Sequence, residues 1–329
     1  MLIGGSVACV AAITTLSSAS VSAGNERLPR GGTVVASIRI PQNGGAFAVG
    51  EGAVWATSDA VSILSRIDPK LNSPVVRSTI PSHKTCTDLP GSCGEAAVGS
   101  GALWVARISD DTVIRIDPSD NSVAATIAVG PQPEGIATTP GAVWVVNKGE
   151  PSVSRIDPAT NQVVATIRIG PAHACCSQHM ALAAGAGAVW ASLPDRNTVV
   201  RIDPATNAVA ARIRLSEQPC AFLVADSRTV WSAGGHCAAR VMRIDPKTNR
   251  QSGTVGRALV APLGLAVGFG SLWVADLDAK AIDRINPRTA RVVARLPVGG
   301  NPVRLAVGFG SVWVRDDAGR VLRIKPAAG

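Results

Sequence analysis

Hydrophobic and polar residues alternate along most of the chain, in short runs separated by turn-forming residues. The clearest stretch, residues 133–170, reads PEGIATTPGAVWVVNKGEPSVSRIDPATNQVVATIRIG. It divides into GIATT, AVWVV, SVSRID and VVATIRI, and in the last of these every second residue is Val, Ala or Ile. A period of two predicts half-buried β-strands. The DPATN before the last strand predicts a tight turn.

This four-strand pattern occurs seven times. A tryptophan marks the second strand of each copy, and Arg-Ile-Asp-Pro or a close variant follows 10 to 12 residues later. The tryptophans are Trp55, Trp104, Trp144, Trp190, Trp231, Trp273 and Trp313. Self-similarity at about 40 to 50 residues, with Gly-rich turns, indicates a β-propeller whose blades each have four strands. We expect the tryptophans to form the core between blades.

The two ends of the chain complement each other. Residues 33–40, TVVASIRI, match the outer strand but precede the first tryptophan, and the last copy stops after RIKP without an outer strand. The sequence therefore predicts an all-β fold, a single seven-bladed propeller over residues 32–326, with the N-terminal strand completing the last blade. Residues 24–31 are then a short linker and residues 327–329 a tail.

The first 23 residues contain no charge and end in a small-x-small pattern, which predicts a cleaved signal peptide and a secreted or periplasmic protein. No later stretch has 18 uninterrupted apolar residues, so we expect no membrane span. We also expect a monomer. The net charge is +9, but the chain has no tyrosine and four phenylalanines. Stacking platforms for bases are scarce, so we expect no nucleic-acid partner.

The elements VWVVN, SRIDPATN and VVATIRIG resemble the YVTN-type propeller repeat, and the whole pattern is similar to the streptogramin B lyase family. That resemblance implies a seven-bladed ring that opens a cyclic depsipeptide by elimination, with magnesium and a histidine base. The stretch SQHMALAAGAGAVWASL places His179 at the base position. Ser177 and Leu193 stand where the family has its metal-binding carboxylates.

All four histidines, and the six cysteines after the predicted signal peptide, fall in links and loops on one face of the expected ring. Two interpretations compete for them. In the first, disulfides join Cys86 to Cys93, Cys220 to Cys237 and Cys175 to Cys176. Export favours this interpretation because nearby thiols are normally oxidised outside the cytoplasm. Alternatively, zinc or copper would be bound by His173, Cys175, Cys176 and His179.

Charged residues also occupy unusual places near the central channel. Glu95 and Arg304 each stand nine residues before a tryptophan, where most blades have Gly, Ala or Phe, and we expect them to face each other. Polar residues end several second strands and form a rim whose carboxylates could hold magnesium or calcium. The predicted ligand contacts are Glu95, Arg304, His173, His236, Arg107, Asn147, Asp276 and Asp316.

These features favour a propeller that binds a small molecule or an extracytoplasmic protein on its cysteine-rich face, without catalysis. The alternative is a metal-dependent lyase or related hydrolase, with His179 as base and magnesium or zinc as cofactor. The two differ in metal content and in turnover of a cyclic depsipeptide, because only the lyase would form a linear product in a magnesium-dependent reaction.

Overall fold

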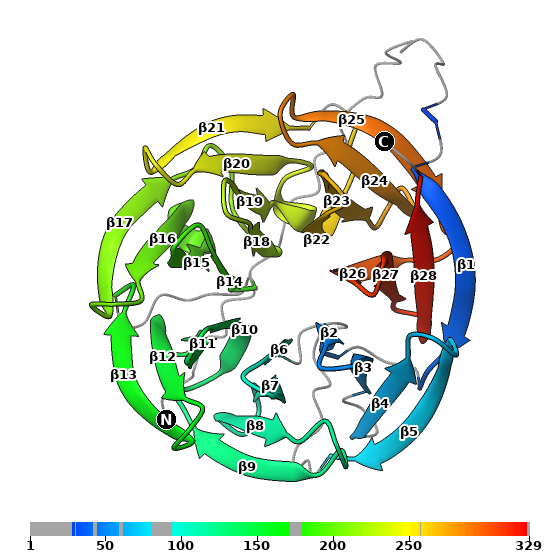
Figure 1. Ribbon diagram of the computed structural model, residues 1–329. Coiled ribbons are helices and arrows are strands. Elements are labelled where there is room, and N and C mark those ends of the chain that lie inside the picture. The colour runs from blue at the N-terminus through cyan, green and yellow to red at the C-terminus, as the bar shows by residue number, and fades with distance from the viewer. Residues whose placement is uncertain are drawn as a thin grey trace, which may run out of the picture.

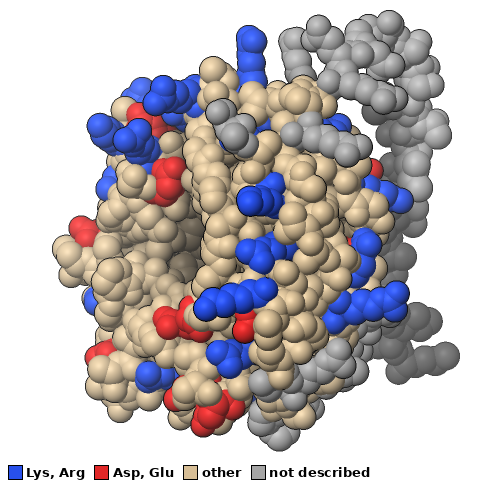
Figure 2. Space-filling view, turned by 45° about the vertical axis from the view of Figure 1, so that its right-hand side comes forward, with Lys and Arg blue, Asp and Glu red and all other residues tan. Residues whose placement is uncertain are grey.

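The computed structural model describes residues 28–29, 31–41, 45–58, 62–80, 94–171, 179–256 and 258–327. Over these residues the chain forms seven antiparallel sheets of four strands, arranged as the blades of a ring (Figure 1). The space-filling view shows the ring hollowed by a central channel (Figure 2). The predicted seven-bladed propeller is confirmed.

The strands of blades 1 to 3, each from the inner strand to the outer one, follow the chain. Blade 1 consists of β2 (Phe47–Gly50), β3 (Ala53–Ser58), β4 (Ile63–Asp68) and β5 (Ser73–Thr79). Blade 2 consists of β6 (Ala96–Gly99), β7 (Ala102–Arg107), β8 (Thr112–Ile116) and β9 (Val123–Ala128). Blade 3 consists of β10 (Pro133–Thr139), β11 (Ala142–Asn147), β12 (Ser152–Asp157) and β13 (Gln162–Arg168).

Blades 4 to 7 continue in the same order. Blade 4 consists of β14 (Leu182–Gly185), β15 (Ala188–Leu193), β16 (Thr198–Asp203) and β17 (Ala208–Arg214), and blade 5 of β18 (Leu223–Ala225), β19 (Val230–Ala233), β20 (Val241–Asp245) and β21 (Arg250–Val255). Blade 6 consists of β22 (Pro262–Gly268), β23 (Ser271–Asp276), β24 (Ala281–Asn286) and β25 (Arg291–Pro297), and blade 7 of β26 (Pro302–Gly308), β27 (Ser311–Asp316), β28 (Arg320–Pro326) and β1 (Gly32–Arg39). The short 3-10 helices η2 (Pro194–Arg196) and η3 (Gly235–Cys237) follow the second strands of blades 4 and 5.

The ring closes where the sequence predicts. Strand β1 pairs antiparallel with β28, from Gly32 opposite Pro326 to Arg39 opposite Arg320. Blade 7 therefore takes its outer strand from the N-terminal part and its other three from the C-terminal part. This pairing covers the outer side of β28 and completes the last blade with its fourth strand.

The repeated tryptophan and arginine form one structural unit in every blade. All seven tryptophans are at most 1% exposed, which confirms them as core residues. The repeated arginine stacks on the tryptophan of its own blade, with 5.1 to 5.7 Å between the guanidinium carbon and the ring centroid. Arg155 also donates to Asn207 Oδ1 at 2.7 Å and to the Pro204 carbonyl of blade 4. The unit therefore packs a blade internally and binds it to the next blade.

Strand direction separates the loops into two faces. The links from outer to inner strands and the loops between second and third strands lie on one face, called here the loop-rich face. The hairpins between first and second strands, and the turns between third and outer strands, lie on the opposite, hairpin face. No helix in the described ranges is long and apolar enough to span a membrane.

One boundary differs from the prediction and affects the site. Strand β10 begins at Pro133, two residues before the GIATT expected from the sequence, with an irregular register between Pro133 and Ile136. Glu134 therefore belongs to the inner strand and is 1% exposed. The period-two pattern missed it because the irregularity breaks the alternation.

Candidate functional site

Inner strands of neighbouring blades begin around the central channel on the loop-rich face, and their first residues carry the candidate site. Glu95 directly precedes β6, Glu134 lies at the start of β10 and His179 precedes β14. Arg304 lies near the start of β26 in blade 7, and Phe222 directly precedes β18 in blade 5. We call these five residues the mouth cluster.

Close backbone packing brings blades 2, 3 and 4 together here. The Glu95 N–H donates to the Glu134 carbonyl at 2.9 Å, so the two inner strands are bonded at the site itself. Gly94 has φ of +80°, and a side chain there would collide with the Ala106 carbonyl. A side chain at Gly135 would come within 2.7 Å of the Leu182 N–H. Glycine thus allows the chain reversal and the close contact that bring the acidic residues to His179.

Both ring nitrogens of His179 contact carboxylates. Nδ1 lies 3.0 Å from Glu134 Oε1, and Nε2 lies 2.8 Å from Glu95 Oε1. Glu134 Oε2 also accepts the Met180 N–H at 2.7 Å, which fixes the carboxylate against the strand start. Ionised carboxylates only accept hydrogen bonds, so satisfying both contacts requires a proton on each nitrogen. The geometry therefore favours an imidazolium cation.

The electrostatics agree with that protonation state. Burial of the imidazole opposes its charge, but the carboxylates of Glu134 and Glu95 outweigh this effect and raise the pKa of His179 from 6.5 to about 9. Burial also opposes ionisation of Glu134, yet the charge and hydrogen bond of His179, the Lys148 ammonium and the Met180 N–H lower its pKa. The His179–Glu134 pair is thus ionised at neutral pH.

Glu95 and Arg304 meet across the channel as the repeat register predicts. Arg304 Nη1 lies 3.6 Å from Glu95 Oε1, and Nη2 lies 3.4 Å from the Gly94 carbonyl. The Arg304 guanidinium stacks 4.8 Å from the Phe222 ring centroid, and the His179 ring lies 5.0 Å from the same centroid. Phe222 therefore supports two cations on one aromatic surface.

Together with the neighbouring Lys148, the mouth cluster presents three cations and two carboxylates. Lys148 Nζ lies 3.8 Å from Glu134 Oε1, and with His179 and Arg304 it outnumbers the two glutamates by one charge. The side chains of His179 and Lys148 are 18% and 17% exposed, whereas that of Glu134 is 2% exposed. On the blade 3 and 4 side, the cations of His179 and Lys148 are therefore more accessible than the buried carboxylate of Glu134 that they contact.

Four residues of the predicted rim lie outside the mouth cluster. Arg107 pairs with Asp110, and buried Asn147 donates to Ser152 Oγ and Ser154 Oγ. These side chains hold the loops between second and third strands in blades 2 and 3.

The two aspartates of the predicted rim, Asp276 and Asp316, also accept hydrogen bonds from nearby protein groups. Asp276 accepts the Val260 and Ala261 N–H groups, at 3.0 and 2.8 Å. Asp316 accepts the Arg320 Nε–H at 2.6 Å. Both aspartates are at most 1% exposed, so the structure gives them loop-supporting contacts.

The predicted Cys220–Cys237 disulfide is present, joining the start of blade 5's inner strand to η3. His236 is exposed beside it. The predicted pairs Cys86–Cys93 and Cys175–Cys176 lie outside the described residues. His173 and Ser177 also lie outside the described residues, so the zinc or copper set that includes His179 remains a prediction.

The mouth cluster does not fit a magnesium or zinc ion. Each carboxylate contacts a different nitrogen of the same imidazole, so the donor atoms surround the ring instead of one point. Within the described ranges, no three His, Cys, Asp or Glu residues are grouped as metal ligands. We therefore derive no metal-dependent step from these residues.

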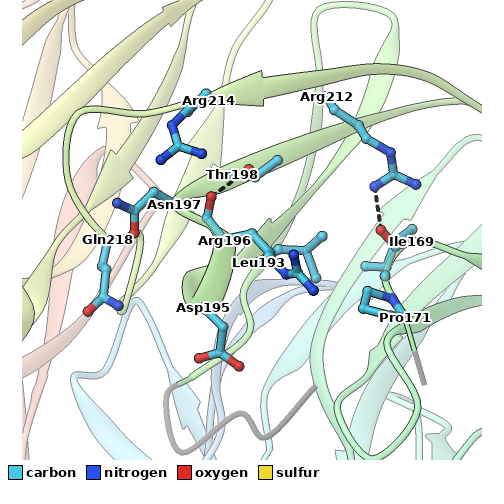
Figure 3. Close-up of a pocket in the computed structure, with 11 residues that line it drawn as sticks. Ile169, Pro171, Leu193, Asp195, Arg196, Asn197, Thr198, Arg212, Arg214 and Gln218 are labelled. Carbon is cyan, nitrogen blue, oxygen red and sulfur yellow. Dashed lines mark hydrogen bonds between the residues drawn. The ribbon is translucent and has the colours of Figure 1, made fainter. Parts of the chain in front are cut away.

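A second depression lies further out on the loop-rich face, where the end of blade 3 meets blade 4 (Figure 3). Arg212 and Arg214 of β17 lie on one side of it, and Asp195 and Arg196 of η2 on another. Arg212 donates to the Ile169 carbonyl. Its guanidinium therefore binds blade 4 to the end of blade 3.

Sequence reasoning missed Glu134, the residue that fixes His179. It stands ten residues before Trp144, one place from the register of Glu95 and Arg304, so counting back from the tryptophan passes over it. A useful signal was its charge: most blades have small or apolar residues at these inner-strand starts.

The fold matches solved propellers of different activities. Virginiamycin B lyase from Staphylococcus aureus matches with a TM-score of 0.72 at 14% identity, covering 89% of this chain and 99% of the lyase. A catalytically inactive histidine-to-alanine variant of that lyase, with quinupristin, matches with 0.71 at 14% identity, covering 89% and 99%. Hydrazine synthase from Kuenenia stuttgartiensis matches with 0.70 at 14% identity, covering 88% and 98%.

No protein-family model matches the chain, and no curated protein matches its sequence. Likeness at 14% identity to a lyase and to a synthase establishes architecture, since one fold hosts many activities. The chain is therefore a seven-bladed β-propeller with the architecture of virginiamycin B lyase.

Proposed function

We propose that the protein binds a small anionic molecule at the mouth cluster and catalyses no reaction there. The observation that carries this proposal is the clamping of His179 between Glu95 and Glu134, with Arg304 and Lys148 beside the carboxylates. Fixed, partly desolvated cations at the opening of a channel attract anions more strongly than exposed surface cations do.

The charge balance indicates what the ligand carries. The most accessible groups on the blade 3 and 4 side, His179 and Lys148, are cations, and Lys148 adds one positive charge to an otherwise balanced mouth cluster. A carboxylate or phosphate would accept hydrogen bonds from the Lys148 ammonium and be attracted by the charge of His179, whose two N–H groups already contact Glu95 and Glu134. Phe222, partly buried between Arg304 and His179, offers apolar contact for the rest of a small ligand.

The lyase alternative requires His179 to remove a proton. A pKa of about 9 leaves only about 1% of the imidazole neutral at pH 7, and both nitrogens already contact carboxylates. Leu193, where the lyase family has a metal-binding carboxylate, is 5% exposed within blade 4. These observations favour binding over acid–base catalysis.

The disulfide bears on where the protein is located. A disulfide between Cys220 and Cys237 is compatible with an oxidising compartment, where such bonds persist. We propose a secreted or periplasmic monomer whose partner is a small molecule or an extracytoplasmic protein, delivered or sensed through the loop-rich face.

The test is calorimetric titration of the full chain with acetate, succinate, citrate and inorganic phosphate at low ionic strength. We expect at least one to bind, and Arg304→Gln or Lys148→Gln to weaken that binding about tenfold. Arg168→Ala, which removes an exposed cation from β13, should change nothing. No binding of any probe, or equal binding by all variants, contradicts the proposal.

The catalytic alternative has its own assay. Incubation with quinupristin, with and without magnesium, should yield no ring-opened product. Magnesium-dependent product that disappears in His179→Gln would replace the binding proposal with the lyase.

A further inference from the structure

The hairpin face, opposite the mouth cluster, carries two exposed aromatic side chains. Phe269 and Phe309 occupy the tips of the β22–β23 and β26–β27 hairpins and are 43% and 40% exposed. Their φ angles are +52° and +51°, the left-handed region that bulky residues avoid. Equivalent tips in other blades hold smaller or charged residues: Glu51, Ser100 and Ala186. The fold therefore does not require phenylalanine there.

The turns between third and outer strands make this face electrostatically two-sided. Five turns begin with aspartate, but blade 6 has Asn286 and blade 7 has Lys325. The turns of blades 5, 6 and 7, residues 245–250, 286–291 and 325–327, carry +1, +2 and +1. Those of blades 2, 3 and 4, residues 117–122, 157–162 and 203–208, carry −2, −1 and −1. The three turns on one side thus sum to +4 and the three on the other side to −4.

The aromatic tips coincide with the positive half. The exposed cations of the turns in blades 5 to 7 are Lys247, Arg250, Arg288, Arg291 and Lys325. We call blades 5, 6, 7 and 1 of this face the basic half-face.

A third apolar side chain extends the pattern into blade 1. Leu71 is 67% exposed and follows exposed Lys70 in the β4–β5 turn. Arg323 bonds that turn to the blade 7 hairpin: Nη1 donates to the Pro69 carbonyl at 2.6 Å, and Nη2 to the Phe309 carbonyl at 3.3 Å. Leu71 and Phe309 therefore project from turns joined by a single guanidinium.

We infer that the basic half-face docks peripherally on an anionic phospholipid surface. Its apolar side chains project at turn tips, so they can enter a soft interface. The surrounding Lys and Arg side chains complement lipid phosphates, and apolar insertion with cationic attraction is how peripheral proteins bind membranes. This orientation leaves the mouth cluster on the far side, open to solution. The inference does not depend on the proposed ligand.

Vesicle co-sedimentation of the full chain tests this docking. We expect binding to phosphatidylcholine vesicles containing about one third phosphatidylglycerol, and at least tenfold weaker binding to phosphatidylcholine alone. Phe269→Ser with Phe309→Ser should weaken binding about tenfold while keeping the fold, since Ser100 occupies the same place in blade 2. Lys247→Ala with Arg288→Ala should also weaken vesicle binding about tenfold. The fold should be kept, because alanine occupies these turn positions in blades 3 and 4.

Matched controls separate this face from general basicity. Arg39→Ala with Arg168→Ala removes two exposed cations from outer strands and should leave vesicle binding unchanged. Failure to bind phosphatidylglycerol vesicles, or equal weakening by this control, would overturn the inference. Equal binding to soluble polyglutamate, insensitive to the phenylalanine substitutions, would overturn the lipid assignment and favour an acidic protein partner.

Discussion

Replacing His179 with glutamine should remove a pH-dependent part of the protein's stability. The folded imidazole has a pKa of about 9 instead of 6.5, so above pH 6.5 the folded state holds a proton that the unfolded chain has released. The stabilisation is complete below pH 6.5 and is lost as the pH rises through about 9. The contribution of His179 to the free energy of unfolding therefore falls between about pH 6.5 and about pH 9.

Its magnitude follows from the pKa difference. One pKa unit corresponds to about 1.36 kcal/mol, so at pH 7 the raised pKa is worth about 2.5 kcal/mol, and at pH 10 almost nothing. The His179 side chain is 18% exposed, and solvent screening reduces the interaction somewhat. We therefore expect about 2 kcal/mol of the free energy of unfolding to disappear between pH 7 and pH 10.

Urea unfolding followed by tryptophan fluorescence measures this loss, because all seven tryptophans are buried in the blades. The chain has no tyrosine, so no phenol titrates in the alkaline range. Subtracting the His179→Gln profile from the wild-type profile removes the contributions of lysines and thiols. His236→Gln, at an exposed histidine on the same face, is the control and should retain the wild-type profile.

The reasoning fails if wild type and His179→Gln lose stability in parallel between pH 7 and pH 10. It also fails if the wild type gains stability relative to the variant as the pH rises, since that would mean a neutral folded imidazole.

Three further outcomes follow from the contacts. Glu134→Gln should lower the pKa of His179 toward 6.5 and reduce the free energy of unfolding in urea at pH 7 by about 2 kcal/mol. Glu95→Gln should reduce it less, because that carboxylate is more exposed. A larger loss in Glu95→Gln would refute Glu134 as the main partner of His179. Cys220→Ser should cost about 3 kcal/mol without reductant, as the bond spans 17 residues; an unchanged unfolding midpoint would contradict it. Arg155→Ala should cost about 1 to 2 kcal/mol by removing the bonds to blade 4, and unchanged thermal melting would contradict that role.

The fold was predictable because the repeat determines it through local signals. Seven tryptophans at near-equal spacing, alternating strands and Asp-Pro turns all require four-stranded blades, and the incomplete last copy requires the N-terminal strand beside it. What the repeat could not give was the partner of each arginine. Stacking on tryptophan and bonding across blades depend on how neighbouring blades pack, which no single copy contains.

The site was predictable only where it departs from the repeat in register. Glu95 and Arg304 stand out because both share one offset from their tryptophans, and they do face each other. Glu134 was missed because it stands ten residues before its tryptophan, one place away from the offset that Glu95 and Arg304 share. Polarity alone was a poor guide to the rim, since Asn147 and Asp276 are buried and hold loops.

The most direct test of the central claim is a nitrogen-detected NMR titration of His179 in the full chain, from about pH 5 to about pH 11. We predict that both ring nitrogens carry protons at neutral pH, that the midpoint lies near 9, and that Glu134→Gln lowers it. A midpoint at or below 6.5, or one unprotonated nitrogen at neutral pH, would contradict a cationic binding site and restore His179 as a base.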